Sequence, residues 1–158
     1  MPQLIRAAPV DTPIGRLWIA ASEAGVVAIE RGEEALRWAV EPASGLAHRA
    51  GRQVAEYFAG ERHAFTVPLD LAGVAAFDAD VYRAAMAIPH GATASYGEVA
   101  MAVGAPRAAR AVGNAMARCR LFPIVPCHRV IHADGTLGGW GSETWIKRWL
   151  LDFEQPGR

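Results

Sequence analysis

The sequence predicts an α/β protein in two parts, a small N-terminal sheet-plus-helix domain over residues 1–73 and a mainly helical domain over residues 78–158. Two observations predict this class. Short apolar runs separated by glycines dominate the first part, which is typical of strands and turns. From Phe77 onward the apolar residues recur at helical spacing, and residues that start or stop helices bound the segments.

The N-terminal strands are expected in the runs IGRLWIAAS (14–22) and GVVAIERG (25–32), which suggest a hairpin or meander. Helical spacing follows over 33–40 and 48–61, and HAFTVPLDLAG (63–73) suggests a further strand. No residue in this part suggests a chemical site, since His48 and His63 each stand alone. We therefore expect the first domain to be structural.

The second part predicts a helix-turn-helix. After a helix over 78–89, the segment SYGEVAMAVG opens with Ser95 and carries Glu98 three residues later, which is a capping-box pattern. It ends at Gly104, and Pro106 suits the first turn of a second helix, PRAARAVGNAMARC. Two short helices joined by a tight turn are common in proteins that do not bind DNA, so this pattern alone leaves both readings open.

Downstream, the segment FPIVPCHRVI contains two prolines and is too short for a helix, so Cys127 and His128 are expected at a strand end or in a turn. A glycine-rich loop, ADGTLGGWG, follows, where backbone can approach a ligand closely. The chain then forms an amphipathic helix, TWIKRWLLDFE, with a packing face that we expect to consist of Trp145, Ile146, Trp149, Leu150 and Phe153.

Composition bounds the class of protein further. The chain has 158 residues, is 52% hydrophobic and 20% charged, and carries no formal net charge, which argues against disorder and against a strong polyanion binder. Five arginines nevertheless lie between Val99 and Ala133 without any acid, and such a basic stripe attracts phosphates. Two cysteines, no signal-peptide pattern and no run of 18 apolar residues predict a cytoplasmic protein without a membrane span.

Cys127 has two readings. In apolar surroundings a thiolate is disfavoured, so an inert core cysteine is the default. A nucleophilic cysteine needs a base or positive charge to favour the thiolate over a reference pKa of about 8.5. His128 is adjacent, but neighbours on a regular strand point to opposite faces, so a turn or a bridging water would be needed to couple them.

Five blocks in order, SYGEVA, PRAARAVGNAM, IVPCHRVI, DGTLGGWG and KRWLLDFE, resemble the O6-alkylguanine-DNA alkyltransferases, which are direct-reversal DNA repair proteins. The resemblance is strong over residues 78–154 and weak before them. It implies that Cys127 is the alkyl acceptor, that His128 takes the thiol proton through a water, and that Glu154 orients His128. One protein molecule is consumed for each lesion in such a reaction, and a relay of this kind activates a buried thiol.

The resemblance also assigns residues to the DNA. Arg110 fills the stack vacated by a flipped nucleotide, and its helix enters the minor groove. Small residues such as Ala109 and Gly113 suit close approach to the groove, and Arg107 and Arg129 suit phosphate contacts. The resemblance assigns base binding to four positions. They are Tyr96, the backbone at Val130, Trp140 as an aromatic wall, and the Gly141 N–H, which would face O6. The alternatives for these residues are ordinary helix propensity and core packing.

Two positions depart from the family pattern. Cys119 stands where the family carries a hinge asparagine, and a thiol is a much poorer hydrogen-bonding group than an amide. Trp140 replaces a tyrosine in the glycine-rich loop. These changes put alkyl-group range and rate in question, but not the type of reaction.

The sequence therefore predicts transfer of a methyl or other small alkyl group from O6 of guanine, and less well from O4 of thymine, in double-stranded DNA to Cys127. We expect a monomer that needs no cofactor and no metal, since the cysteines and histidines lack zinc-ligand number and spacing. Two alternatives remain, a non-catalytic alkyltransferase-like lesion binder and a Cys-His hydrolase of small molecules. Cys127 within an intact PCHRV argues against the first, and the arginine-bearing helix argues against the second.

Overall fold

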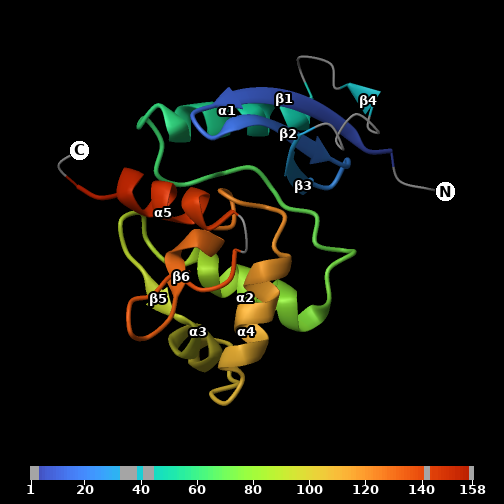
Figure 1. Ribbon diagram of the computed structural model, residues 1–158. Coiled ribbons are helices and arrows are strands. Elements are labelled where there is room, and N and C mark those ends of the chain that lie inside the picture. Colours follow the sequence, from blue (N-terminus) through green and yellow to red (C-terminus); the bar gives the residue numbers. More distant parts are fainter. Residues whose placement is uncertain (1–3, 33–38, 41–44, 141–142, 157–158) are drawn as a thin grey trace. The chain divides into compact units, whose positions relative to one another are not determined.

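The computed structural model describes residues 4–32, 39–40, 45–140 and 143–156, and the chain divides into two compact units between residues 73 and 74 (Figure 1). Gly141, which the sequence assigns to base binding, lies outside the described residues.

The N-terminal unit is a four-stranded sheet covered by one helix. The strands are β1 (Arg6–Thr12), β2 (Gly15–Ala21), β3 (Val26–Arg31) and β4 (Ala39–Val40), in the order β3-β2-β1-β4. β2 runs antiparallel to both of its neighbours, β1 and β3, whereas β4 pairs parallel with the start of β1. Helix α1 (Leu46–Phe58) packs on β1 and β2, and its buried Val54 and Tyr57 share this unit's interior with Leu17 and Ile19.

Two expectations for this unit are wrong. Residues 39–40 form a strand rather than the end of a helix, and 63–73 makes a single bridge, Leu69 with Val26, instead of a strand. β1 was not predicted either, because its alanines and proline lack the apolar alternation of a strand. The bridge depends on Gly25, where a Cβ would lie 2.6 Å from the Leu69 carbonyl carbon.

The C-terminal unit is mainly helical, which confirms the predicted fold class. Its helices are α2 (Ala76–Met86), α3 (Tyr96–Ala102), α4 (Ala109–Arg118) and α5 (Thr144–Phe153). A short parallel ladder joins β5 (Ala94–Ser95) to β6 (Val130–Ile131) and places the start of α3 beside the Cys127 segment. An ion pair between Asp78 and Arg118, with Nη2 and Oδ1 2.9 Å apart, ties α2 to the C-terminal end of α4.

The helix-turn-helix consists of α3 and α4, which pack against each other. The capping box is present, since Glu98 N–H donates to Ser95 Oγ and Ser95 N–H donates to Glu98 Oε1, both at 3.0 Å. Gly104 has φ +77°, a conformation that ends a helix and favours glycine. α4 begins at Ala109, three residues later than predicted, so Pro106 and Arg107 lie in the turn before it.

The buried face of α5 differs from the predicted one. It consists of Ile146, Lys147, Leu150 and Leu151, whereas Trp145 is 52% exposed. Trp149 and Phe153 stack on each other with ring centroids 4.9 Å apart and are half-buried. The predicted face was wrong because it was chosen from the apolar residues alone, and a lysine such as Lys147 is rarely buried.

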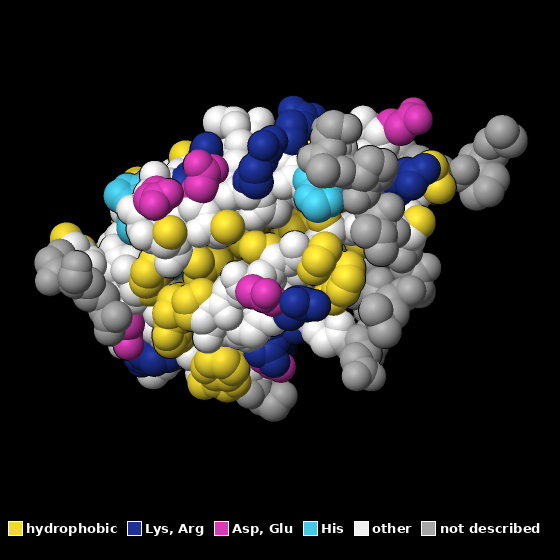
Figure 2. Space-filling model, turned by 90° about the horizontal axis from the view of Figure 1, so that it is seen from above, with side chains coloured by type: hydrophobic (Ala, Val, Ile, Leu, Met, Phe, Trp, Pro, Cys, Tyr) yellow, Lys and Arg dark blue, Asp and Glu magenta, His cyan; other side chains and the backbone are white. Residues whose placement is uncertain are grey.

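Acidic and basic side chains are interspersed over the face seen in Figure 2, with apolar side chains between them. The helices that the structure describes are all too short or too polar to cross a membrane.

Candidate active site

The segment that carries Cys127 is a single turn of 3₁₀ helix, η2 (Cys127–Arg129), which leads directly into β6. Its turn is closed by the Arg129 N–H, which donates to the Pro126 carbonyl at 2.9 Å. Nine of the ten residues from Leu121 to Val130 are buried, and Phe122 is half-buried. The turn expected for Cys127 and His128 is therefore present, so these two residues do not follow the side-chain alternation of a regular strand.

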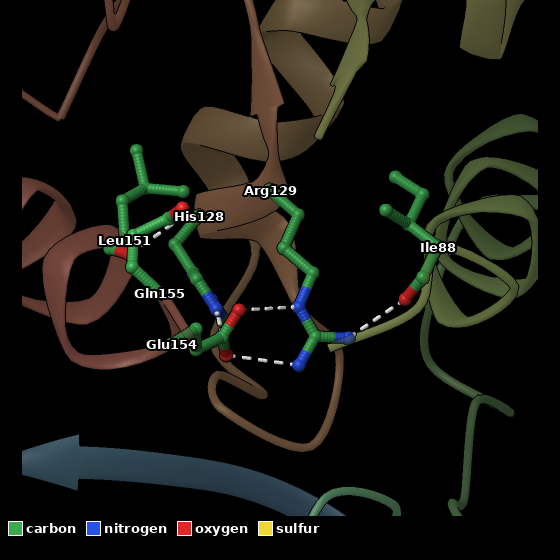
Figure 3. Close-up of polar contacts among 6 residues, drawn as sticks. All are labelled: Ile88, His128, Arg129, Leu151, Glu154 and Gln155. Atoms are coloured by element: carbon green, nitrogen blue, oxygen red, sulfur yellow. Dashed lines mark hydrogen bonds and ion pairs between the residues drawn. The ribbon is translucent and has the colours of Figure 1, made fainter. Parts of the chain in front are cut away.

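A buried carboxylate links the histidine to an arginine. Glu154, the residue that ends α5, lies with its Oε2 2.7 Å from His128 Nε2. Arg129 donates to both oxygens of the same carboxylate, each at 2.8 Å, and to the Ile88 carbonyl at 2.7 Å (Figure 3). Because Arg129 is a fixed cation, the Glu154 carboxylate is balanced by charge and held in one orientation.

This arrangement sets the tautomer of His128. A carboxylate only accepts hydrogen bonds, so His128 Nε2 carries the proton and Nδ1 keeps its lone pair. Nδ1 is buried and makes no hydrogen bond to any residue that the structure describes. Burial lowers the pKa of His128, although the hydrogen bond with Glu154 acts in the opposite direction, and the imidazole is neutral at pH 7. His128 can therefore accept a proton at Nδ1.

Cys127 is 1% exposed. Burial raises the pKa of its thiol well above the usual value, and contact with the Cys119 side chain raises it further, while the charge of Lys147 lowers it. At rest the residue is a thiol, so its reaction requires that a base remove the proton as the new bond forms.

Lys147 is fully buried, and sequence analysis missed it as a site residue. Its Nζ donates to the Val130 carbonyl at 2.7 Å, to the Leu137 carbonyl, and to the Tyr96 hydroxyl at 3.3 Å. Burial lowers the pKa of Lys147 to about 8, so it is largely protonated at neutral pH. The sequence does contain one signal for the burial of this lysine. Lys147 directly follows Ile146, so it lies on the face of α5 that packs inward.

Tyr96 is buried at the start of α3 and connects the acceptor turn to the glycine-rich loop. Its hydroxyl donates to the Leu137 carbonyl at 3.3 Å, and its ring lies edge-on to His132 with centroids 5.0 Å apart. Gly138 has φ +78°, and a Cβ there would overlap the Tyr96 hydroxyl and lie 3.0 Å from Tyr96 Cζ. The loop thus approaches Tyr96 at a point where only glycine fits.

The residues assigned to DNA contact lie in different environments. Arg107, in the turn, and Arg110, in the first turn of α4, are both exposed, and Ala109 is half-buried. Gly113 faces inward, since a Cβ there would meet the Tyr96 ring at 3.8 Å. A Cβ at this position would make an ordinary packing contact, so the packing of α4 does not itself require a glycine, and the assignment of Gly113 to DNA contact stays a prediction.

The assignment of Arg129 to phosphate contact is wrong. Arg129 is 5% exposed and its guanidinium is used by Glu154 and Ile88, which leaves it unavailable to DNA. The sequence alone places Arg129 in a basic stripe, because its partner, the carboxylate of Glu154, lies 25 residues away in the chain. Its position instead fixes Glu154, and through Glu154 the histidine.

Trp140 is half-buried and packs on Phe122 with ring centroids 5.2 Å apart. Cys119 caps the end of α4, where its N–H donates to the Met116 carbonyl at 3.2 Å. Among the described residues, no group of three or more histidine, cysteine or acidic side chains lies close enough to hold a metal ion.

The comparisons with known proteins cover both units. Residues 76–156 match the family model described as the DNA binding domain of 6-O-methylguanine DNA methyltransferase, and residues 5–71 match its ribonuclease-like domain. A methylated-DNA–protein-cysteine methyltransferase from Mycobacterium leprae is 42% identical, with 96% of this chain and 93% of that protein covered. A DNA base-flipping protein from Thermus thermophilus is also 42% identical, over 92% and 97%.

A solved structure of a relative has the same fold. The crystal structure of Mycobacterium tuberculosis OGT in complex with DNA matches with a TM-score of 0.83 and 42% identity, covering 96% of this chain and 92% of that one. Since both the sequence and the fold match over nearly the whole chain, this protein belongs to the 6-O-methylguanine DNA methyltransferase family.

Proposed function

We propose that this protein repairs DNA by direct reversal, transferring a methyl or small alkyl group from O6 of guanine to Cys127. The observation that carries the proposal is the buried arrangement of Cys127, His128 and Glu154 in a chain of this family. A thiol of raised pKa, followed in the chain by an imidazole with a free lone pair, suits a nucleophile that is activated only when substrate arrives.

The reaction balances as a single displacement. The Cys127 proton passes to His128 Nδ1, through a water as the family resemblance implies, and the sulfur attacks the O6-alkyl carbon. The S–C bond forms as the C–O6 bond breaks, and guanine leaves as an anion that takes up a proton. Glu154 stabilises the imidazolium that forms, and Arg129 holds Glu154 in place. The thioether is stable, so each molecule reacts once.

Lys147 supplies positive charge to the same step. Its ammonium lowers the pKa of Cys127 and holds the carbonyls of Val130 and Leu137, which belong to the acceptor strand and the glycine-rich loop. Because the group is buried, its charge acts through a medium of low polarity and is only weakly screened. Tyr96, bonded to the same ammonium, and Trp140 suit the walls of a pocket for the flipped base.

DNA is the partner that the family and the solved complex support. The exposed Arg107 and Arg110 at the start of α4 suit minor-groove binding, with Arg110 replacing the flipped nucleotide. Binding as a monomer and a cytoplasmic location stay predictions.

The decisive test is incubation with duplex DNA that carries radiolabelled O6-methylguanine. Label should move to the protein in a 1:1 ratio and should be absent from Cys127→Ala. Mass spectrometry of the tryptic peptide 121–129 should locate the added methyl group on Cys127. Tight lesion binding by the wild-type protein without transfer would instead favour the lesion-binder alternative, for which the relative named a DNA base-flipping protein is a reason to test.

A second assay separates flipping from chemistry. Arg110→Ala should slow transfer from duplex DNA at least tenfold, yet leave transfer from the free base O6-methylguanine unchanged, because a free base needs no extrusion. Equal slowing with both substrates would remove Arg110 from the flipping step.

A further inference from the structure

A groove in the N-terminal unit, called the α1 groove below, lies along α1 and the segment that follows this helix. It has a volume of about 580 Å³, which is in the range of small-molecule sites. Three arginines, Arg49, Arg52 and Arg62, line it together with a single acid, Glu56. Every residue that lines the groove belongs to the N-terminal unit. This excess of cations suits an anionic ligand.

One face of α1 supplies much of the lining of the α1 groove. The contributing residues follow one another at spacings of three and four, which places them on the same side of the helix: Arg49, Arg52, Gln53 and Glu56. The residues that α1 buries lie on the opposite side of the helix. The groove therefore opens away from the interior of the N-terminal unit.

Hydrogen bonds tie the segment after α1 to this polar face. Gln53 Nε2 donates to Thr66 Oγ1 at 2.6 Å, and Gln53 Oε1 accepts from the Thr66 N–H at 2.9 Å. Arg62 donates to the Glu56 carboxylate at 3.2 Å and to the Ala64 carbonyl at 3.0 Å. Because these bonds hold Arg62 and Thr66 in place, the groove is formed before a ligand arrives, which lowers the entropic cost of binding.

Arg49 and Arg52 do nothing comparable for the fold. Both are exposed, and neither side chain makes a hydrogen bond or ion pair with any residue that the structure describes. Three residues apart, they place two like charges side by side on the helix, which disfavours the folded state. Glu56 does not balance them, because its carboxylate is bonded to Arg62. Two uncompensated positive charges therefore line the α1 groove.

We propose that the α1 groove binds a small polyphosphate anion, either inorganic triphosphate or the phosphate chain of a nucleotide, through Arg49, Arg52 and Arg62. A guanidinium binds phosphate oxygens through two parallel N–H donors. A chain of phosphates brings several negative charges close together, which matches two uncompensated cations better than one phosphate does. The Thr66 hydroxyl accepts from Gln53 and keeps its own proton as a further donor. Binding at this groove does not depend on alkyl transfer.

Isothermal titration calorimetry of the full-length protein with sodium triphosphate tests the site. Arg49→Gln/Arg52→Gln should weaken binding by about tenfold or more, as expected for the loss of charged hydrogen bonds. Arg16→Gln/Arg83→Gln is the matched control and should bind like wild type. It removes the same charge from two exposed arginines that are paired with aspartates elsewhere. No binding by wild type, or equal weakening by the two double variants, would overturn the proposal.

Thermal unfolding without ligand separates binding from folding. Arg49→Gln/Arg52→Gln should melt no lower than wild type, because the two side chains have no partner among the described residues. A lower melting temperature would mean that the two arginines stabilise the fold, and it would overturn the reason given for an anion site.

Two further probes identify the source of the phosphates. ATP that binds more tightly than triphosphate would point to a nucleotide, and equal affinities would point to the phosphate chain alone. Undamaged duplex DNA is the third probe. If Arg49→Gln/Arg52→Gln weakens binding of the duplex but not of triphosphate, the α1 groove contacts DNA and the proposal fails. Alkyl transfer by the same variant is measured separately, so the repair function is judged on its own.

Discussion

Gly138 is the residue at which the glycine-rich loop touches Tyr96, and it has a left-handed backbone conformation. Gly138→Ala should displace Tyr96 or the loop, and we expect alkyl transfer to slow at least tenfold, since small displacements of positioning groups have effects of this order. The matched control is Gly139→Ala, where a Cβ would meet open space and the backbone needs no glycine. Single-turnover rates with duplex DNA measure both, and equal rates would mean that the contact is not needed.

Lys147 and His128 together predict a bell-shaped pH profile for single-turnover alkyl transfer. The pKa of His128 is lowered from its usual value by burial, so the rate should rise as pH increases through the acidic range, where the imidazole loses its proton. The pKa of Lys147 is about 8, so the rate should fall above that pH as the ammonium that favours the Cys127 thiolate becomes neutral.

Lys147→Met tests the alkaline limb. The variant keeps a side chain of similar length without charge, and we expect it to lower the plateau rate by about tenfold or more, which corresponds to one pKa unit at Cys127. It should also remove the decline above about pH 8. Arg148→Met is the matched control, because Arg148 is exposed on the next position of α5. A decline that persists in Lys147→Met would assign this limb to another group.

At the scale of elements, α4 should carry the electrostatic part of DNA binding through the turn before it and its first turn. Arg107→Ala should weaken binding to any duplex and reduce the slope of log K against log salt by about 1, as expected for loss of one phosphate contact. Arg16→Ala is the control, since Arg16 is already paired with Asp11 at 2.8 Å in the N-terminal sheet. An unchanged slope for Arg107→Ala would place this arginine away from the backbone.

The elements also show which parts of the structure are visible in the sequence. The helix-turn-helix was predictable because its signals are local, a capping box at Ser95 and a left-handed Gly104. β1 and β4 were missed because their stability comes from pairing with other segments. Family resemblance predicts roles for Cys127 and His128, whereas the Arg129–Glu154 ion pair and the burial of Lys147 depend on contacts of η2 and β6 with α5 and the residue that ends it.

At the scale of the whole molecule, the folded state should respond to its own reaction. The acceptor sulfur has almost no free surface, and adding a methyl group to a packed interior typically costs about 1–3 kcal/mol. We therefore expect the alkylated protein to melt lower than the unmodified one, by about 2–4 °C for each kcal/mol lost, with a larger decrease for ethyl than for methyl. Thermal unfolding after reaction with O6-methyl- and O6-ethylguanine DNA measures this, and unmodified DNA is the control. Identical transitions would mean that the pocket accommodates the group without strain.

The burial of Cys127 thus bears on the lifetime of the protein in a cell. A loss of about 1–2 kcal/mol is enough to change the abundance of a marginally stable protein several-fold, because proteases act on the unfolded fraction. Molecules that have already reacted would be cleared before fresh ones. The repair capacity of the cell would then follow the rate of new synthesis rather than the total amount of the protein.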